Sequence, residues 1–93
     1  MKFEWNEEKN ISNHSKHEIW FEEAQTVWTD ELAAEFHDSD HSDSEDRYIR
    51  VGHSTRSRIV LVVFCERQDG EIIRIISARK ATLQERKDYE EGI

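Results

Sequence analysis

The sequence contains no proline, only three glycines and a single cysteine, Cys65. A lone cysteine excludes an internal disulfide. Cys65 lies inside the apolar run IVLVVFCE, where it is expected to pack as a small hydrophobic side chain. With one thiol and no close pairing of cysteine with histidine, a zinc site is not expected either.

Long hydrophobic runs are also lacking. No apolar segment approaches the roughly 20 residues that a membrane-spanning helix needs. The N-terminus, MKFEWNEEKN, lacks the apolar segment of a signal peptide. We therefore expect a cytoplasmic protein that makes no contact with a membrane.

The length of the chain suits one domain. A single hydrophobic core fits 93 residues, whereas two cores would each be marginal. Three tryptophans and four phenylalanines supply apolar material for that core, although 37% of the residues are charged. We expect residues 1–93 to form one folded domain with one functional site.

The basic residues are concentrated in the middle of the chain. The formal net charge is −8, yet residues 47–80 contain eight Lys and Arg residues against three acidic ones. Residues 1–46 contain fourteen acidic residues against three basic ones. The overall charge argues against nonspecific nucleic-acid binding, whereas the basic segment permits a confined phosphate site.

The N-terminal third is expected to form a short strand and two helices. Residues 2–5 alternate in polarity, which predicts an edge strand. Asn6 can cap a helix that ends near His17, with acidic residues in its first turn, where the helix dipole favours them. A second helix is predicted over residues 20–28, because its apolar residues recur at spacings of three and four.

The rest of the chain predicts a sheet and a closing helix. Apolar segments typical of strands lie at residues 32–38, 47–53, 58–67 and 72–79. Asp69-Gly70 is a strong hairpin signal between the last two strands. Thr82 and Glu85 form a capping box that opens a C-terminal helix. The pattern predicts an α+β fold with an antiparallel sheet of about four strands.

One acidic loop contains five residues that could bind a metal ion, His37, Asp38, Asp40, His41 and Asp43. The loop fails as an EF-hand, because its sixth residue is Asp43 rather than glycine and its twelfth is Ile49 rather than glutamate. We interpret it as a solvated acidic loop and keep a metal-binding protein as a third, minor hypothesis.

The segment 72–80 carries cations among its apolar residues. Alternation along a strand places Arg74, Ala78 and Lys80 on one face and Arg79 on the other. Arg74 therefore shares a face with apolar neighbours, which predicts a partly buried cation. Structural ion pairing with the abundant carboxylates and a concave phosphate site both fit this spacing.

Arg, Lys and His suit phosphate chemistry, and no Walker A, zinc-protease, serine-hydrolase or paired-cysteine motif is present. Cleaving RNA without a metal requires a base for the 2′-hydroxyl proton, charge neutralisation at phosphorus and a proton for the leaving 5′ oxygen. Arginine cannot be the base because it stays protonated, whereas histidines commonly titrate near neutral pH. His17 and His53 are the candidates outside the acidic loop.

A family resemblance extends over nearly the whole chain. It is carried by FEW with Lys9, Asn13, Lys16 and His17, by FEEA at 21–24, DRYIRVG at 46–52, GEIIRIISARKAT at 70–82, and ER with Tyr89. The run RIISARKAT followed by ER is the most specific of these stretches. On these residues the chain resembles the BrnT family of type II toxins, ribonucleases with a RelE-like fold.

The resemblance implies a cytoplasmic toxin that cleaves RNA, blocks translation and uses no metal or other cofactor. It also implies a hetero-oligomeric complex with a BrnA-like, ribbon-helix-helix antitoxin. Because the antitoxin binds operator DNA, this chain would contact DNA only indirectly.

Carried onto matching positions, the resemblance implies catalytic roles for His17 in proton transfer and for Arg74 and Arg79 at the phosphate. Substrate positioning is assigned to Lys16, Arg47 and Lys80. His53 remains the alternative to His17.

Two positions depart from the family pattern, because Glu18 and Ser57 stand where the family commonly has glycine. The net charge of −8 is also unusual for a nuclease that blocks translation. It fits either a member without catalytic activity or an acidic face that contacts a basic antitoxin. The alternative function is therefore a non-catalytic interaction domain that binds a DNA-binding partner and modulates its transcriptional regulation.

Overall fold

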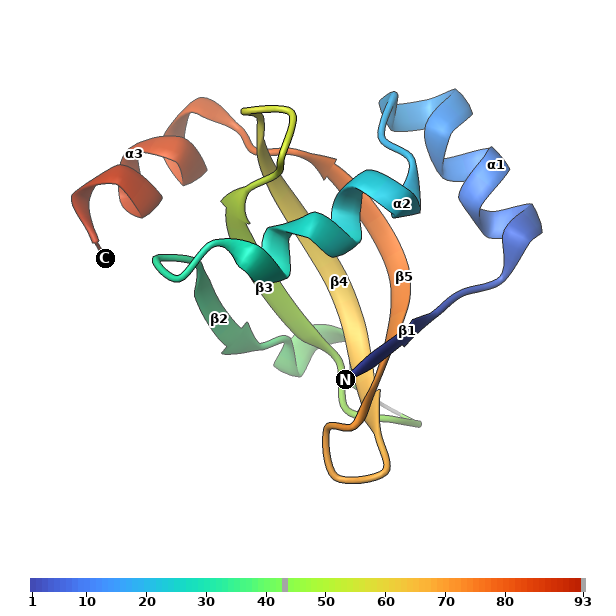
Figure 1. Ribbon diagram of the computed structural model, residues 1–93. Coiled ribbons are helices and arrows are strands. Elements are labelled where there is room, and N and C mark those ends of the chain that lie inside the picture. Colours follow the sequence, from blue (N-terminus) through green and yellow to red (C-terminus); the bar gives the residue numbers. More distant parts are fainter. Residues whose placement is uncertain (43, 93) are drawn as a thin grey trace.

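The computed structural model of the chain describes residues 1–42 and 44–92. Five strands form one sheet, and helices lie against one face of it, beside the edge at β5 and beyond one end (Figure 1). The strands are β1 (Lys2–Glu4), β2 (Ala34–His37), β3 (Tyr48–His53), β4 (Ile59–Arg67) and β5 (Ile72–Lys80). The helices are α1 (Glu7–His17), α2 (Phe21–Ala24) and α3 (Leu83–Glu91), with the 3-10 helices η1 (Gln25–Thr29) and η2 (Ser39–His41).

The sheet has the order β1-β5-β4-β3-β2. Neighbouring strands from β2 to β5 are antiparallel, as the hydrophobic pattern and the hairpin signal predicted. The N-terminal strand β1 joins the sheet parallel to β5, with Lys2 opposite Ile72 and Glu4 opposite Arg74. The predicted α+β fold is confirmed, with five strands in the sheet rather than about four.

Helix α1 is held mainly by buried amides. Asn6 caps it by accepting a hydrogen bond from the backbone N–H of Lys9, whereas its one large apolar residue, Ile11, is exposed. Asn13 lies buried beside β5, where its side chain accepts from Ala78 N (3.0 Å) and donates to Ala78 O (2.8 Å). These bonds satisfy backbone groups of β5 at a point on its edge that β1 does not reach. Helix α1 therefore takes the place of a neighbouring strand there.

The predicted second helix, residues 20–28, is shorter than expected. Its α-helical part, α2, ends at Ala24 and continues as the 3-10 helix η1. Thr26 and Thr29 each donate a hydroxyl hydrogen bond to the carbonyl three residues earlier, at 2.6 and 2.7 Å. The threonine hydroxyls therefore favour the tighter turn, which apolar periodicity alone does not reveal.

Strand β5 contains a bulge that changes which residues share a face. Val63 pairs with Ser77 and the next residue of β4, Phe64, pairs with Ile75, so one extra residue is inserted in β5. The predicted alternation is therefore wrong beyond this point. Arg74 pairs with Cys65 and Arg79 pairs with Leu61, so both arginines lie on one face of the sheet. Lys80, which pairs with Val60, lies on the other face.

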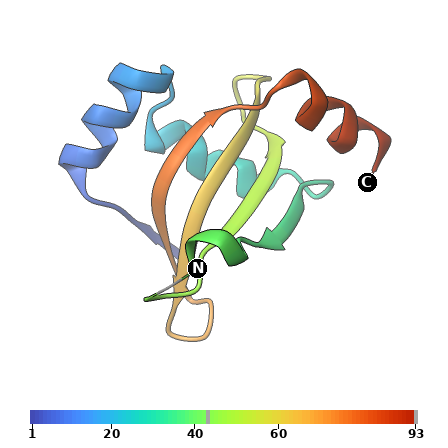
Figure 2. The same ribbon diagram turned by 180° about the vertical axis from the view of Figure 1, so that it is seen from behind.

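The two faces of the sheet are covered unequally. Ile19, Phe21, Ala24 and Val27 pack on one face, where they bury the apolar side chains of β4 and β5. The other face, seen from behind in Figure 2, carries a smaller cluster around Val51 that Tyr89 of α3 only partly covers. Among the described residues, no helix is long and apolar enough to cross a bilayer.

Candidate active site: a basic groove at one end of the sheet

Three cations predicted from the sequence are bound to carboxylates. Arg74 lies 3.5 Å from Glu4, which also contacts Arg67 at 3.5 Å. Arg79 forms two parallel hydrogen bonds with Glu85, at 2.8 and 2.9 Å, and Lys80 lies 3.5 Å from Glu18. Structural ion pairing, one of the two interpretations of these residues, therefore accounts for much of their placement.

The six predicted site residues do not meet at one place. The five-residue separation of Arg74 and Arg79 along β5 corresponds to about 15 Å. Lys16 and His17 lie exposed at the end of α1, beside a groove of about 200 Å³ that Ile76 and Ser77 also line. Arg47 precedes β3, where its backbone N–H donates to the Ser42 hydroxyl.

The acidic loop forms pairs rather than a cluster. His37 lies 3.1 Å from Asp46, and His41 lies 3.1 Å from Asp38. Within residues 1–42 and 44–92, no group of three or more His, Cys, Asp or Glu side chains is placed to hold a metal ion. Asp43, which belongs to the metal hypothesis, lies outside the described residues.

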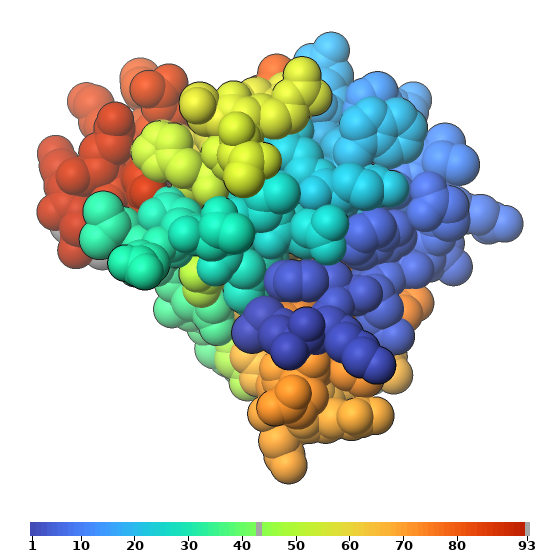
Figure 3. Space-filling model, in the orientation of Figure 1, coloured from blue at the N-terminus to red at the C-terminus, as the bar shows by residue number. Residues whose placement is uncertain are grey.

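A basic groove of about 370 Å³ lies at the end of the sheet where β3 and β5 end and β4 begins. We call it the basic groove; it is lined by His53, Ser57, Arg58, Ile59, Lys80, Ala81, Arg86 and Glu90. In Figure 3 the loop before β4, in yellow, lies at the surface next to α3, in red. The lining contains three cationic side chains and one carboxylate, a set that suits phosphate, although Glu23 and Glu18 pair with Arg58 and Lys80.

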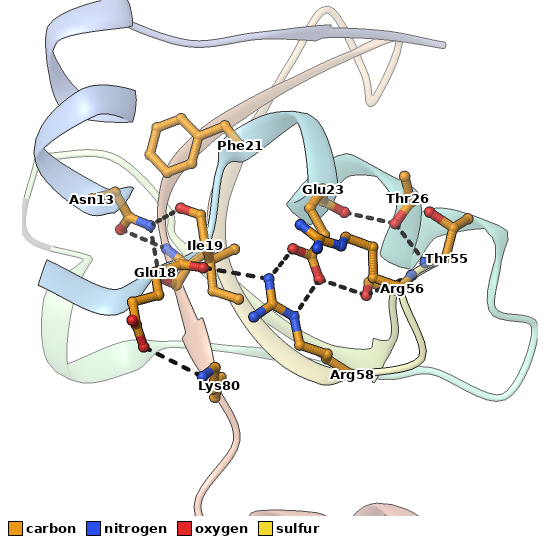
Figure 4. Close-up of polar contacts among 12 residues, drawn as sticks. Asn13, Glu18, Ile19, Phe21, Glu23, Thr26, Thr55, Arg56, Arg58 and Lys80 are labelled. Carbon is orange, nitrogen blue, oxygen red and sulfur yellow. Dashed lines mark hydrogen bonds and ion pairs between the residues drawn. The ribbon is translucent and has the colours of Figure 1, made fainter. Parts of the chain in front are cut away.

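Arg58 is fixed in the groove by a buried carboxylate, as Figure 4 shows. Its guanidinium donates to both carboxylate oxygens of Glu23, through Nε at 2.9 Å and through a second nitrogen, and to the carbonyl of Glu18. Burial alone raises the pKa of the Glu23 carboxyl, but hydrogen bonds from Arg58 and Ser54 outweigh it and hold that pKa below its ordinary value. Arg58 is therefore a rigid cation.

The loop that carries Arg58 is itself anchored. Thr55 donates its backbone N–H to the Thr26 hydroxyl at 3.0 Å, and the Ser54 hydroxyl donates to Glu23 at 2.7 Å. Ser57 adopts a left-handed backbone conformation, with φ of 61°. These contacts tie one wall of the basic groove to the helical layer.

A larger hollow, of about 600 Å³, lies on the neighbouring surface. It is lined by Glu7, Trp20, Glu22, Glu23, Thr26, Thr55 and Arg56. Three carboxylates against one arginine repel a phosphate backbone, so size alone does not make this hollow the candidate RNA site.

His53 stands at the edge of the basic groove in contact with α3. Its Nδ1 lies 2.9 Å from the Tyr89 hydroxyl, which donates a short hydrogen bond to Asp30. Burial and the adjacent Asp30 carboxylate raise the pKa of Tyr89 to about 12. Burial opposes ionisation of Asp30, yet hydrogen bonds from Tyr89 and from the His53 and Leu32 backbones lower its pKa.

Comparison with known proteins decides the family. A model of the family described as ribonuclease toxin, BrnT, of type II toxin-antitoxin system matches residues 5–85. The chain belongs to the BrnT family. It is also similar to the crystal structure of the Brucella abortus ribonuclease toxin BrnT, with 26% identity, a TM-score of 0.67, and coverage of 88% of this chain and 97% of that one. No curated protein matched the chain.

Membership of the BrnT family confirms the resemblance seen in the sequence and makes this chain a member of a ribonuclease toxin family. The matched stretch contains His53, Arg58 and Lys80, whereas Arg86 and Tyr89 follow it. The basic groove is thus lined by residues inside the matched stretch and by Arg86 and Glu90 of α3, which follow it.

Sequence reasoning identified Lys80 and named His53 as an alternative, but it gave no role to Arg58, Arg86, Asp30 or Tyr89. The sequence did contain a signal that His53, Arg58 and Lys80 lie close together. In an antiparallel meander, the end of one strand lies beside the start of the next, so these three residues belong to the same end of the sheet.

Proposed function

We propose that this chain is the toxin of a type II toxin–antitoxin system and a metal-independent endoribonuclease that cleaves RNA in the basic groove. In the proposed role the whole chain acts as one toxin domain in the cytoplasm and inhibits translation. The single observation that carries this proposal is the placement of Arg58, Lys80 and Arg86 around His53 in one groove.

The chemistry of the groove supports cleavage through the 2′-hydroxyl of RNA. Attack of that hydroxyl on the neighbouring phosphorus builds negative charge on the phosphate oxygens. One well-placed cation stabilises such charge by about 3 kcal/mol, by analogy with oxyanion donors. Arg58 is held rigidly by Glu23, so it can offer its charge without a large reorganisation on binding.

The residue roles expected from the sequence are revised in part. Lys80 keeps its role in substrate positioning, because it lines the basic groove and its pair with Glu18 is exposed. We propose that Arg58 and Arg86 take the phosphate-binding roles, because both line the basic groove, whereas Arg74 and Arg79 do not.

A competing assignment keeps proton transfer at His17, with Lys16 beside it and Arg47 contributing to substrate binding. Replacement of each histidine by alanine separates the two assignments. Loss of cleavage in His17→Ala, with cleavage retained in His53→Ala, would move the site to the end of α1.

We propose that the partner is a BrnA-like, ribbon-helix-helix antitoxin, which would bind operator DNA in the complex. The acidic N-terminal half, with fourteen acidic residues against three basic ones in residues 1–46, supports a basic partner. Such a partner would neutralise the toxin in a hetero-oligomer, while this chain contacts DNA only through it.

One set of contacts favours a second function. Because Arg74, Arg79 and Lys80 are paired with carboxylates in a chain of net charge −8, a non-catalytic domain that binds the antitoxin and modulates transcription also fits. This alternative shares the partner but requires no cleavage.

An RNA cleavage assay at low salt in the presence of EDTA separates the two functions. We expect purified protein to cleave single-stranded RNA in EDTA, and the cognate antitoxin to abolish cleavage. Intact RNA after incubation, together with tight antitoxin binding, would leave only the interaction domain. Cleavage that EDTA stops would contradict metal independence.

A further inference from the structure

We propose that Asp30, Tyr89 and His53 form a hydrogen-bonded chain that makes His53 the general base of the cleavage reaction. The inference rests on the proposed function, in which the basic groove binds and cleaves RNA. His53 is the catalytic residue of this chain, and Tyr89 and Asp30 are positioning residues that act through it.

The direction of the hydrogen bonds determines which imidazole nitrogen carries the proton. An ionised carboxylate can only accept, so the single Tyr89 proton is donated to Asp30. The Tyr89 oxygen is then an acceptor for His53 Nδ1, 2.9 Å away, which must carry the hydrogen of the neutral ring. His53 Nε2 therefore keeps its lone pair, as a base that faces RNA requires.

The Asp30 carboxylate, which ends the hydrogen-bonded chain, is held in place by backbone N–H groups. Asp30 Oδ2 accepts the His53 N–H at 2.8 Å, and Oδ1 accepts the Leu32 N–H at 2.9 Å. Gly52 makes room for it, because a Cβ at that position would lie 2.9 Å from Asp30 Oδ2 and 2.8 Å from the Ala33 Cβ. The need for this close approach explains the glycine at the end of DRYIRVG.

His53 is both anchored and accessible. Its side chain is 49% exposed, whereas that of Asp30 is only 13% exposed. The imidazole also contacts the Tyr89 ring edge-on, with centroids 5.3 Å apart. The ring therefore has a fixed orientation at a surface that a phosphodiester can reach.

Charged groups from three elements share the groove with His53. Arg58 precedes β4, Lys80 ends β5, and Arg86 and Glu90 belong to α3. The three cations would hold the phosphate next to the imidazole. Glu90 is the one carboxylate in the groove lining, while Glu23 pairs with Arg58 and Glu18 with Lys80 from outside it.

The proposed step balances without a metal or cofactor. His53 Nε2 takes the proton of the 2′-hydroxyl, the O2′–P bond forms, and the P–O5′ bond breaks. The departing 5′ oxygen takes a proton from water, and the imidazolium returns its proton to solvent. The products are a 2′,3′-cyclic phosphate and a 5′-hydroxyl end.

The test measures kcat and KM of RNA cleavage in EDTA for three variants. His53→Ala should lower kcat roughly 100-fold or more, and added imidazole should restore part of the lost activity. Tyr89→Phe keeps the ring but removes the hydroxyl, so kcat should fall about tenfold with KM within twofold of wild type. The matched control, Tyr48→Phe, changes the other tyrosine, which lies outside the basic groove, and should cleave at the wild-type rate.

Thermal melting shows whether each variant is folded. If Tyr89→Phe is misfolded, His53→Ala still tests the inference. Wild-type kcat in His53→Ala would overturn the role of His53 as general base. Wild-type kcat in a folded Tyr89→Phe would overturn the role of the hydrogen-bonded chain. These outcomes leave the proposed function standing if Arg86→Ala loses cleavage. Failure of the wild-type protein to cleave any RNA would instead reject the proposed function.

Discussion

Glu18 and Ser57 occupy backbone conformations that glycine adopts without strain. Both have φ of 61°, and Glu18 is the C-terminal cap of α1, where its N–H donates to the His14 carbonyl. They are also the two positions at which the sequence was expected to depart from the BrnT pattern. A preference for glycine there would have a physical cause, because a left-handed conformation brings a Cβ close to the backbone.

Replacing Glu18 by glycine should stabilise the protein. We expect the free energy of unfolding to rise by about 1 kcal/mol, because the strain is removed while the exposed pair with Lys80 contributes little. Chemical denaturation measures the change. Glu18→Ala, which deletes the same carboxylate but keeps the Cβ, is the control and should not gain stability; equal gains in both variants would contradict the backbone explanation.

At the scale of elements, β5 shows which features of a strand its hydrophobic pattern predicts and which it does not. Its start and its place in an antiparallel hairpin were predicted correctly, and its end to within one residue, because apolar content and the Asp69-Gly70 turn are local signals. Its faces were predicted wrongly beyond Ile75, because the bulge inserts a residue and shifts the alternation. Arg79 was therefore expected opposite Arg74, although the two share a face.

The candidate site was only partly predictable for a related reason. Lys80 lies in a stretch that resembles the family, whereas Asp30 and Tyr89 are 59 residues apart and meet only in the folded chain. No spacing rule connects a loop after η1 with the last turn of α3. Pairing the strand ends would have placed His53, Arg58 and Lys80 together, but it would not have found the residues that orient His53.

Helix α3 has no fully buried residue, so polar contacts contribute to its attachment to the sheet, and the Arg79–Glu85 ion pair is one of them, beside the contacts of Tyr89. Hydrogen bonds from Arg79, opposed in part by burial and helped by Thr82, lower the pKa of Glu85 to about 2. Because the pKa is lower in the folded protein, the stabilisation is complete above the ordinary glutamate value and is lost as the pH falls toward 2.

We therefore expect Glu85→Gln to lose about 1–2 kcal/mol of unfolding free energy at neutral pH, allowing for the solvent around the half-exposed Arg79. The deficit should shrink as the pH falls from about 4.5 toward 2, since the wild-type carboxylate becomes protonated there. Urea denaturation across this range measures the effect. The control is Glu91→Gln on the same helix, and a constant deficit at every pH would contradict the role of the ion pair.

At the scale of the whole molecule, a net charge of −8 leaves the basic groove only partly neutralised, because Glu23 pairs with Arg58 and Glu18 with Lys80, while Arg86 adds a further positive charge to the lining. The groove draws its cations from the loop before β4, the end of β5 and α3, whereas α1 and α2 both begin with acidic residues. If RNA binds in the basic groove as proposed, its affinity should fall as salt rises. Cleavage assays should accordingly be run at low ionic strength.

The most direct test of the account compares Arg86→Ala with Lys87→Ala in cleavage of labelled single-stranded RNA at low salt in EDTA. Both residues are exposed on α3 and each substitution removes one positive charge, but only Arg86 lines the basic groove. We predict that Arg86→Ala lowers kcat/KM by roughly tenfold to hundredfold, and that Lys87→Ala stays within about twofold of wild type. Equal activity of the two variants, either both retained or both lost, would contradict the placement of the active site in the basic groove.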